Sequence, residues 1–229
     1  MIPTLNEAHR LPDLLRALRG EPVAVETVVV DGGSVDGTTE AAHEAGATLV
    51  LSAPRGRGQQ IAAGVAAAHG DVLLFLHADS ALPPGGLVAL DRLLHDRPEV
   101  VGGNFRLLFD GEDGFSRWLT GFYACIRRLG FYYGDSGIFV RRAVLERIGG
   151  VRPIALMEDY DLVRRMRLAG ATACLAEPPL VTSSRRFEGR RPPAIVLGWM
   201  RIHLLYWLGA DPGRLALLYD SERHRAAPR

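Results

Sequence analysis

The sequence contains no lysine, and all 27 of its basic residues are arginine. A Schiff-base lysine, a pyridoxal-phosphate lysine and the lysine of a nucleotide-binding P-loop are therefore excluded. Arginine is the only permanent cation left to bind a phosphate, a role that its planar guanidinium suits. The net charge of +1 gives no global reason to expect nucleic acid or a membrane surface as partner.

Cysteines and long apolar runs are also scarce. Cys125 and Cys174 lie far apart and match no metal-ligand spacing, so we expect free thiols in a reducing compartment. We expect no signal peptide before Pro3, and no clean run of about 18 apolar residues predicts a membrane-spanning helix. The 229 residues suit one large domain or two small ones. These features favour a cytoplasmic globular protein.

Residues 1–80 alternate between short apolar segments and helical patterns. Three strand–helix units closed by a fourth strand predict a parallel sheet with right-handed crossovers. Asn6 is predicted to cap the first helix, and the fourth strand should be buried on both faces. The predicted strands are the short segment before Glu7 and residues 23–30, 48–52 and 72–76.

Chemically distinctive side chains follow these strands. Asp31 follows the second strand, Arg57 lies in a glycine-rich loop after the third, and His77 and Asp79 follow the fourth. Because ligands bind outside the carboxyl ends of parallel strands, we expect the four at one edge of the sheet. Arg57 beside a helix N-terminus is a natural anion site, and Asp79 could hold a phosphate-binding cation. The alternative is a solvated loop whose carboxylates cap helices.

The second half of the chain has a different pattern. Its aromatic helix contains Trp118, Phe122 and Tyr123, a stripe more typical of a core than of a ligand platform. The predicted elements are helices over residues 87–94, 115–129 and 142–148 and strands over residues 100–109 and 138–140.

Three carboxylates, Glu158, Asp159 and Asp161, open a further predicted helix. Acidic residues at a helix N-terminus complement its dipole, so simple capping is one interpretation. The other is a general base held near a substrate, since clustered like charges raise the pKa of one carboxyl group.

Residues 194–209 are strongly apolar but are interrupted by Arg201 and His203. The segment is short for a membrane span. We expect a helix that packs on the domain, in preference to one that lies on a bilayer surface.

Several short motifs occur in a specific order along nearly the whole chain. They are Pro3-Thr4-Leu5-Asn6-Glu7, Val29-Val30-Asp31-Gly32-Gly33-Ser34-Val35-Asp36-Gly37-Thr38, Gly64, Phe75-Leu76-His77-Ala78-Asp79, Tyr133-Gly134-Asp135-Ser136-Gly137 and Glu158-Asp159. In this order they resemble glycosyltransferase family 2, and in particular its small bacterial branch. The resemblance implies an α/β fold of the GT-A type, a Rossmann-like single domain with a mostly parallel central sheet flanked by helices. It also implies an inverting transferase that uses a nucleotide sugar and Mg²⁺ or Mn²⁺.

The resemblance assigns roles to individual residues. Asp159 would be the base that deprotonates the acceptor hydroxyl, with Glu158 as its neighbour. Asp79 would bind the metal, with His77 in the place of the first carboxylate of the family's D-x-D motif. The nucleotide sugar would be bound by Pro3, Thr4, Glu7, Asp31, Ser34, Arg57 and Asp79, and the donor sugar or acceptor would contact Tyr133, Gly134, Asp135 and Ser136.

Two departures from the family pattern matter. His77 replaces a carboxylate, which would weaken or change metal binding. The first strand lacks the apolar residues that usually precede Pro3, so we expect that the start codon lies upstream.

The resemblance implies a division into a nucleotide-binding half (residues 1–80), an acceptor-binding half (81–220) and a flexible tail (221–229). The donor would be a nucleoside-diphosphate sugar, with UDP favoured. The acceptor would be a small molecule or a lipid-linked one, which allows peripheral contact with the inner face of the membrane. No nucleic acid partner is expected.

Three other interpretations remain. Gly56-Arg57-Gly58 after a strand suggests a dinucleotide-binding oxidoreductase, but Ile61 stands where the third glycine of the fingerprint belongs. A nucleotidyltransferase on a similar fold usually needs a lysine that this chain lacks. A catalytically inactive sugar-binding protein would account for His77.

Overall fold

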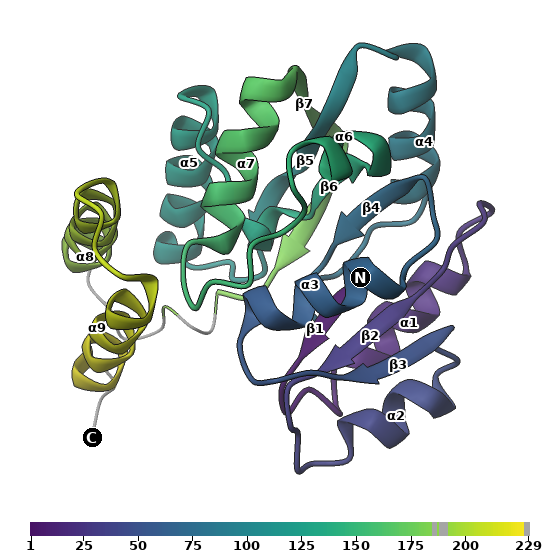
Figure 1. The fold of residues 1–229 in the computed structure, drawn as a ribbon, viewed down its shortest axis with the longest axis horizontal. Coiled ribbons are helices and arrows are strands. Elements are labelled where there is room, and N and C mark those ends of the chain that lie inside the picture. The colour runs from purple at the N-terminus through teal and green to yellow at the C-terminus, as the bar shows by residue number, and fades with distance from the viewer. Residues whose placement is uncertain (185–186, 188–191, 227–229) are drawn as a thin grey trace.

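The computed structural model describes all residues except 185–186, 188–191 and 227–229. Helices cover both faces of a central layer of strands, and two C-terminal helices lie side by side at one end (Figure 1). The strands are β1 (Ile2–Thr4), β2 (Val28–Asp31), β3 (Leu49–Ser52), β4 (Val72–Phe75), β5 (Val100–Phe109), β6 (Ile138–Arg141) and β7 (Ala171–Thr182). The helices are α1 (Leu11–Arg19), α2 (Thr38–Glu44), α3 (Arg57–Ala67), α4 (Gly86–Asp96), α5 (Gly114–Arg128), the 3₁₀ helix η1 (Gly134–Ser136), α6 (Arg142–Arg147), α7 (Glu158–Ala169), α8 (Pro192–Trp207) and α9 (Pro212–Ala226).

The strands form two sheets that meet at Met1. A three-stranded parallel sheet has the order β1-β2-β3, and a mixed sheet has the order β4-β6-β5-β7, in which β6 is antiparallel to β4 and β5. The Met1 amino group donates to the Leu74 carbonyl at 3.0 Å, and the Leu76 amide donates to the Met1 carbonyl at 3.0 Å. Met1 therefore joins the two sheets through its backbone.

Strand β4, predicted to be buried on both faces, is buried on one face and half-buried on the other. Leu73 and Phe75 pack with α3, α6 and α7 on one face, whereas Leu74 and Leu76 pack toward α1, α4 and α5 on the other. Successive side chains of a strand point to opposite faces, so a run of apolar residues serves both layers. His77 directly follows this anchored strand, at the edge where the site lies.

Several predicted elements need correction. Only residues 28–30 of the predicted strand 23–30 belong to β2, which continues to Asp31. Asn6 does not cap α1 but accepts a hydrogen bond from the Val35 amide at 2.9 Å. Strand β7 and helix α9 were not predicted. Most of the tail predicted as flexible, residues 221–229, is helical up to Ala226, and residues 227–229 lie outside the described part.

Candidate active site

The centre of the site is an ion-pair cluster between the two halves of the chain. Arg57 is the first residue of α3, whereas Glu158 and Asp159 open α7. The Arg57 guanidinium donates to Glu158 through Nε and to Asp159 Oδ2 through Nη2, the latter at 3.0 Å. Its Nη1 lies 3.2 Å from His77 Nε2. Residues about 100 positions apart in the sequence are thus in direct contact.

Burial and charge set the protonation of this cluster. The side chain of Glu158 is 2% exposed and that of Asp159 10%. Burial raises the pKa of Glu158, and the nearby Asp159 raises it further against the lowering effect of Arg57. Burial alone would lower the pKa of Arg57, but the two carboxylates outweigh it and raise that pKa.

The Asp159 carboxylate is held in a fixed orientation. Its Oδ2 accepts from the Gly134 amide at 2.9 Å and its Oδ1 from its neighbour's amide, that of Tyr160, at 2.7 Å. A Cβ on Gly134 would lie 3.1 Å from His77 Nε2 and 3.4 Å from Asp159 Oδ2, so a glycine allows this close approach. Met157, just before the cluster, has a left-handed backbone with φ of 69°, a strain that well-packed functional sites tolerate.

A cavity of about 290 Å³ opens onto the cluster. Arg57, Glu158 and Asp159 form its charged side, and Tyr133 and Asp135 from the region of η1 also line it. The sequence interpretation missed the rest of the lining, which comes from α5, the segment before α7, α8 and α9. These residues are Tyr123, Ala155, Leu156, Met157, Trp199, Ile202, His203, Ala216 and Tyr219.

Two hydrogen bonds attach helix α8 to Tyr133 and Tyr160, which precede and follow the two carboxylates of the cluster in the sequence. The Nδ1 atom of His203 lies 2.8 Å from the Trp199 carbonyl and donates to it, and Nε2 lies 2.9 Å from the Tyr133 hydroxyl. Trp207 Nε1 donates to the Tyr160 hydroxyl at 2.8 Å. Burial raises the pKa of Tyr133, and the charge of Asp159 adds to this shift, so Tyr133 stays a neutral donor.

The remaining predicted residues of η1 have structural contacts. Asp135 Oδ2 accepts from the Tyr123 hydroxyl at 2.8 Å, and the Ser136 hydroxyl donates to the Tyr133 carbonyl at 2.6 Å. Both side chains are buried. They stabilise the turn that presents Tyr133 and Gly134 to the cavity.

The Asp31 region forms a second group of predicted residues. Asp31, 4% exposed, accepts from the Gly33 and Ser34 amides at 2.8 and 2.9 Å and from the Ser34 hydroxyl. The Ser34 hydroxyl also accepts from the Asn6 amide at 2.8 Å. The loops after β1 and β2 are thereby tied together at the carboxyl ends of their strands, where ligands of such sheets bind.

Residues of β1 and of the loop after it lie between the Asp31 region and the ion-pair cluster. The Glu7 amide donates to the Thr38 hydroxyl at 2.9 Å, and the Thr4 hydroxyl, which is buried, bonds the Val30 carbonyl at 3.4 Å. Pro3 lines a small cavity of about 20 Å³ together with Arg57, His77, Gly134, Glu158 and Asp159. Pro3 is therefore the predicted donor-binding residue of β1 that lies beside the cluster, whereas Thr4 and Glu7 contact the Asp31 region.

The predicted metal ligands, His77 and Asp79, do not form a cluster like that of Arg57 with the two carboxylates. Among the described residues, no group of three or more His, Cys, Asp or Glu side chains is arranged to hold a metal ion. His77 contacts the Arg57 guanidinium, which has no lone pair and repels a cation. Asp79 follows His77 in the turn after β4 and lines none of the cavities described here. A metal held by a single protein carboxylate would need its other ligands from phosphates and water.

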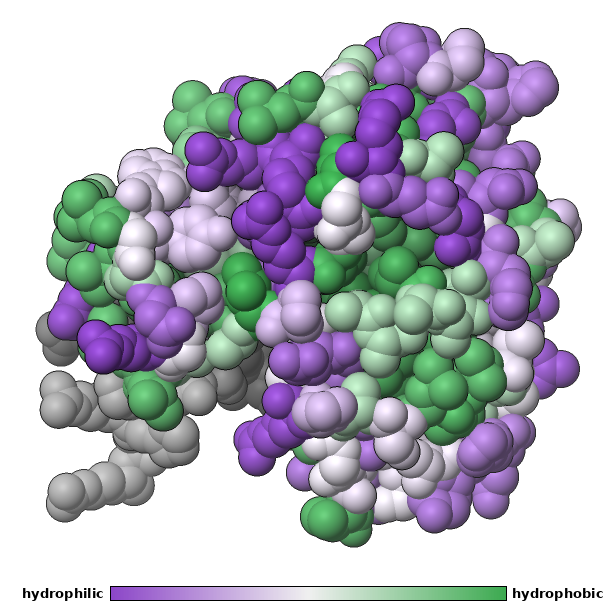
Figure 2. Space-filling model, viewed as in Figure 1, coloured by the Kyte–Doolittle hydropathy of each residue, from purple (hydrophilic) through white to green (hydrophobic). Residues whose placement is uncertain are grey.

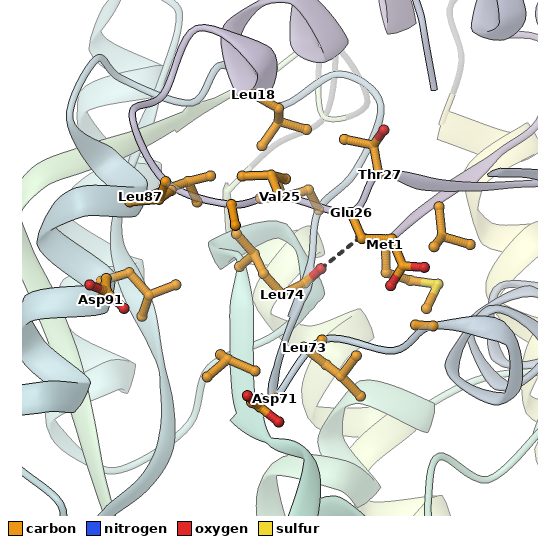
Figure 3. A pocket seen from close by; sticks show the side chains of 18 of the residues that line it. Met1, Leu18, Val25, Glu26, Thr27, Asp71, Leu73, Leu74, Leu87 and Asp91 are labelled. Atoms are coloured by element: carbon orange, nitrogen blue, oxygen red, sulfur yellow. Dashed lines mark hydrogen bonds between the residues drawn. The ribbon is translucent and has the colours of Figure 1, made fainter. Parts of the chain in front are cut away.

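A second large cavity, of about 310 Å³, lies away from this chemistry. It is bounded by Met1, the segment that leads into β2, strand β4 and helix α4 (Figure 3). Its lining is mostly apolar, and none of the predicted site residues is part of it. The candidate active site is therefore the cavity at the Arg57 cluster.

Comparisons with known proteins identify the family of the chain. Residues 1–148 match the family model described as glycosyl transferase family 2. An uncharacterised glycosyltransferase of Mycobacterium tuberculosis is 33% identical over 106 residues, which cover 46% of this chain and 47% of the relative. An undecaprenyl-phosphate 4-deoxy-4-formamido-L-arabinose transferase of Pseudomonas syringae is 32% identical over 113 residues, 44% of this chain and 34% of the relative. This chain thus matches half or less of these curated relatives.

Solved structures share the fold. A mannosyltransferase of Pyrobaculum calidifontis in complex with GDP-Man and Mn²⁺ has a TM-score of 0.67 at 20% identity, over 97% of this chain and 68% of that one. Glucosyl-3-phosphoglycerate synthase of Mycobacterium tuberculosis, in complex with Mn²⁺, UDP and product, has a TM-score of 0.58 at 18% identity, over 92% and 79% of the two chains. The predicted GT-A fold is confirmed, and the chain belongs to glycosyl transferase family 2.

Proposed function

We propose that this chain is an inverting, metal-dependent glycosyltransferase that moves a sugar from a nucleoside-diphosphate sugar to a hydroxyl acceptor. The observation that carries the proposal is the position of Asp159. Its carboxylate is fixed by Gly134 and Tyr160, borders the 290 Å³ cavity and lies beside Arg57 at the start of α3. A base and an anion-binding cation in contact are what a displacement with a diphosphate leaving group needs.

The proposed step is a direct displacement. The acceptor oxygen attacks the anomeric carbon from the face opposite the diphosphate, and the bond from that carbon to the diphosphate oxygen breaks. The bonding electrons leave with the diphosphate, and Asp159 takes the proton of the acceptor hydroxyl. Arg57 offsets charge on the leaving group.

Arg57 has to change partners in this scheme. In the structure its guanidinium binds Glu158 and Asp159. A donor diphosphate would compete for the same fork of N–H donors, which suits phosphate as well as carboxylate. Donor binding would then release Asp159 from Arg57, so the donor would bind before the acceptor is deprotonated.

We assign the metal to Asp79, with the donor diphosphate supplying further ligands. A divalent ion bound there would neutralise charge on the diphosphate. The Mn²⁺ in the two solved relatives supports a divalent ion, and His77 would stay with Arg57. Asp31 and Ser34 would bind the base or ribose, together with Pro3, Thr4 and Glu7.

The acceptor is assigned to the cavity between η1, α8 and α9, within residues 81–220. The name of the Pseudomonas relative specifies undecaprenyl phosphate, which supports a lipid-linked acceptor over a small one. A lipid phosphate would attack without a base, so the role of Asp159 applies to an acceptor that attacks through a hydroxyl. Among the described residues, no helix is long and apolar enough to cross a bilayer. We therefore propose a cytoplasmic enzyme that meets its acceptor at the inner face of the membrane.

The test is thermal unfolding with UDP, GDP, CDP, dTDP or NAD, each with and without Mn²⁺. A ligand that binds only the folded state raises the melting temperature. We expect one nucleoside diphosphate, with UDP favoured, to stabilise the protein in a Mn²⁺-dependent way. Asp79→Ala should remove the Mn²⁺ dependence, and unchanged dependence would refute the metal assignment.

The other outcomes separate the alternatives. Stabilisation by NAD alone would support the oxidoreductase, although the family match and the contact of Arg57 with the acid pair argue against it. Nucleotide binding without transfer to any acceptor would support an inactive sugar-binding protein.

A further inference from the structure

Helix α8 is apolar on two opposite sides. Its inner side carries Ile195, Trp199 and Ile202, which are buried or line the active-site cavity. Its outer side carries large apolar side chains that are 56–74% exposed. They follow helical spacing along one face and are Leu197, Met200, Leu204, Trp207 and Leu208; we call this set the α8 stripe.

A helix that is apolar all round is normally buried on all sides. The outer side of α8 is instead at the surface, at the left edge of the molecule, where Figure 2 shows a small hydrophobic group. Leu217 of the neighbouring α9 is 74% exposed as well. Contiguous exposed apolar surface of this kind marks an interaction site.

The charge distribution indicates what covers the stripe. In the sequence, residues 185–229 contain nine arginines against four acidic residues, a net charge of +5, whereas residues 1–184 carry a net charge of −4. Helix α8 itself contains no acidic residue. Exposed apolar side chains within a cationic segment are the combination that binds anionic lipid surfaces. The same positive charge opposes pairing of this face with a second copy.

We propose that the α8 stripe lies on the surface of an anionic bilayer. Membrane binding is a property beyond the transfer reaction. It rests on the proposed function in one respect, since its role would be to bring the cavity to a lipid-linked acceptor. Trp199, Ile202 and His203 on the other side of the same helix line that cavity. One helix would therefore contact the lipid with one side and the acceptor with the other.

The test is flotation of the full chain with vesicles of phosphatidylcholine alone or mixed with phosphatidylglycerol. We expect the protein to bind anionic vesicles, and to bind them more weakly in high salt. Binding to neutral vesicles should be weaker than to anionic ones. The double variant Leu204→Gln/Leu208→Gln should bind at least about tenfold more weakly, because it loses buried apolar area at the interface. The matched control is Val35→Gln/Leu168→Gln, two apolar residues that are 91% and 82% exposed elsewhere; it should bind like the wild type.

A second measurement needs no variant. Trp207 is the exposed one of the three tryptophans, so brominated phospholipids in anionic vesicles should quench its fluorescence. Absence of binding by the wild type, or equal binding by both double variants, would overturn the proposal. So would a wild-type dimer in light scattering that only the stripe variant dissociates. Flotation needs no donor sugar and nucleotide stabilisation needs no vesicle, so failure of one proposal is distinguishable from failure of the other.

Discussion

The two halves of the molecule hold their carboxylates in different ways. Asp31, in the first half, is bound by amides two and three residues further along its own loop. Asp159, in the second half, is bound by Gly134 and by Arg57, which are 25 and 102 residues away. The Asp31 loop is therefore formed by local geometry. The ion-pair cluster of Arg57 with Glu158 and Asp159 forms only when the two halves are packed together. Catalysis would depend on long-range contacts, and nucleotide binding mainly on local ones.

Asp159→Asn should have the largest effect. Loss of a general base typically lowers the rate by about 10²–10⁴-fold, while the Asp31 region and nucleotide binding stay intact. The measurement is transfer rate together with the nucleotide-induced rise in melting temperature. Asp96→Asn, the same change on the surface of α4, is the control and should leave both unchanged. Equal loss of transfer and binding would make Asp159 structural, whereas persistent transfer would mean that the attacking group is an ionised phosphate that needs no base.

Removal of Arg57 should lower the free energy of unfolding, because Arg57 joins the two halves of the molecule. Arg57→Gln leaves Glu158 and Asp159 buried side by side without their cation, which costs about 3 kcal/mol of the free energy of unfolding. Urea unfolding measures this loss. The exposed pair Arg16–Asp13 is the control, since Arg16→Gln should change stability by less than about 1 kcal/mol.

A double variant tests the coupling. Arg57→Gln/Glu158→Gln removes the unpaired charge, so it should be more stable than the sum of the single changes predicts. Strict additivity would show that the two residues do not stabilise each other.

The same contrast between local and long-range contacts explains what the sequence revealed. The strand–helix units of residues 1–80 follow from local patterns, and the structure confirms them, but β4 pairs in the mixed sheet and not in the predicted parallel sheet with β1, β2 and β3. Strand β7 was missed because Pro178 and Pro179 interrupt it, and proline argues against a paired strand. Its pairing with β5 resumes after a register shift and imposes the strand.

The lining of the cavity was also beyond local patterns. Trp199 and His203 come from α8, and nothing near them in the sequence predicts contact with Tyr133, 70 positions from His203. The interruption of the apolar run by His203 was the one available signal. Packing of residues 194–209 on the domain was predicted and is confirmed for one side of the helix only.

The two anchors of α8 should give the smallest and most specific effects. Tyr133→Phe removes the hydrogen bond to His203, and Tyr160→Phe removes the bond from Trp207. Each should cost about 1 kcal/mol of stability. Only Tyr133 lines the cavity, so only Tyr133→Phe should raise the KM for the acceptor, with kcat and nucleotide binding little changed. An equal rise in KM for both variants would mean that the acceptor responds to the attachment of α8 as a whole, and that Tyr133 acts as an anchor with no contact of its own to the substrate.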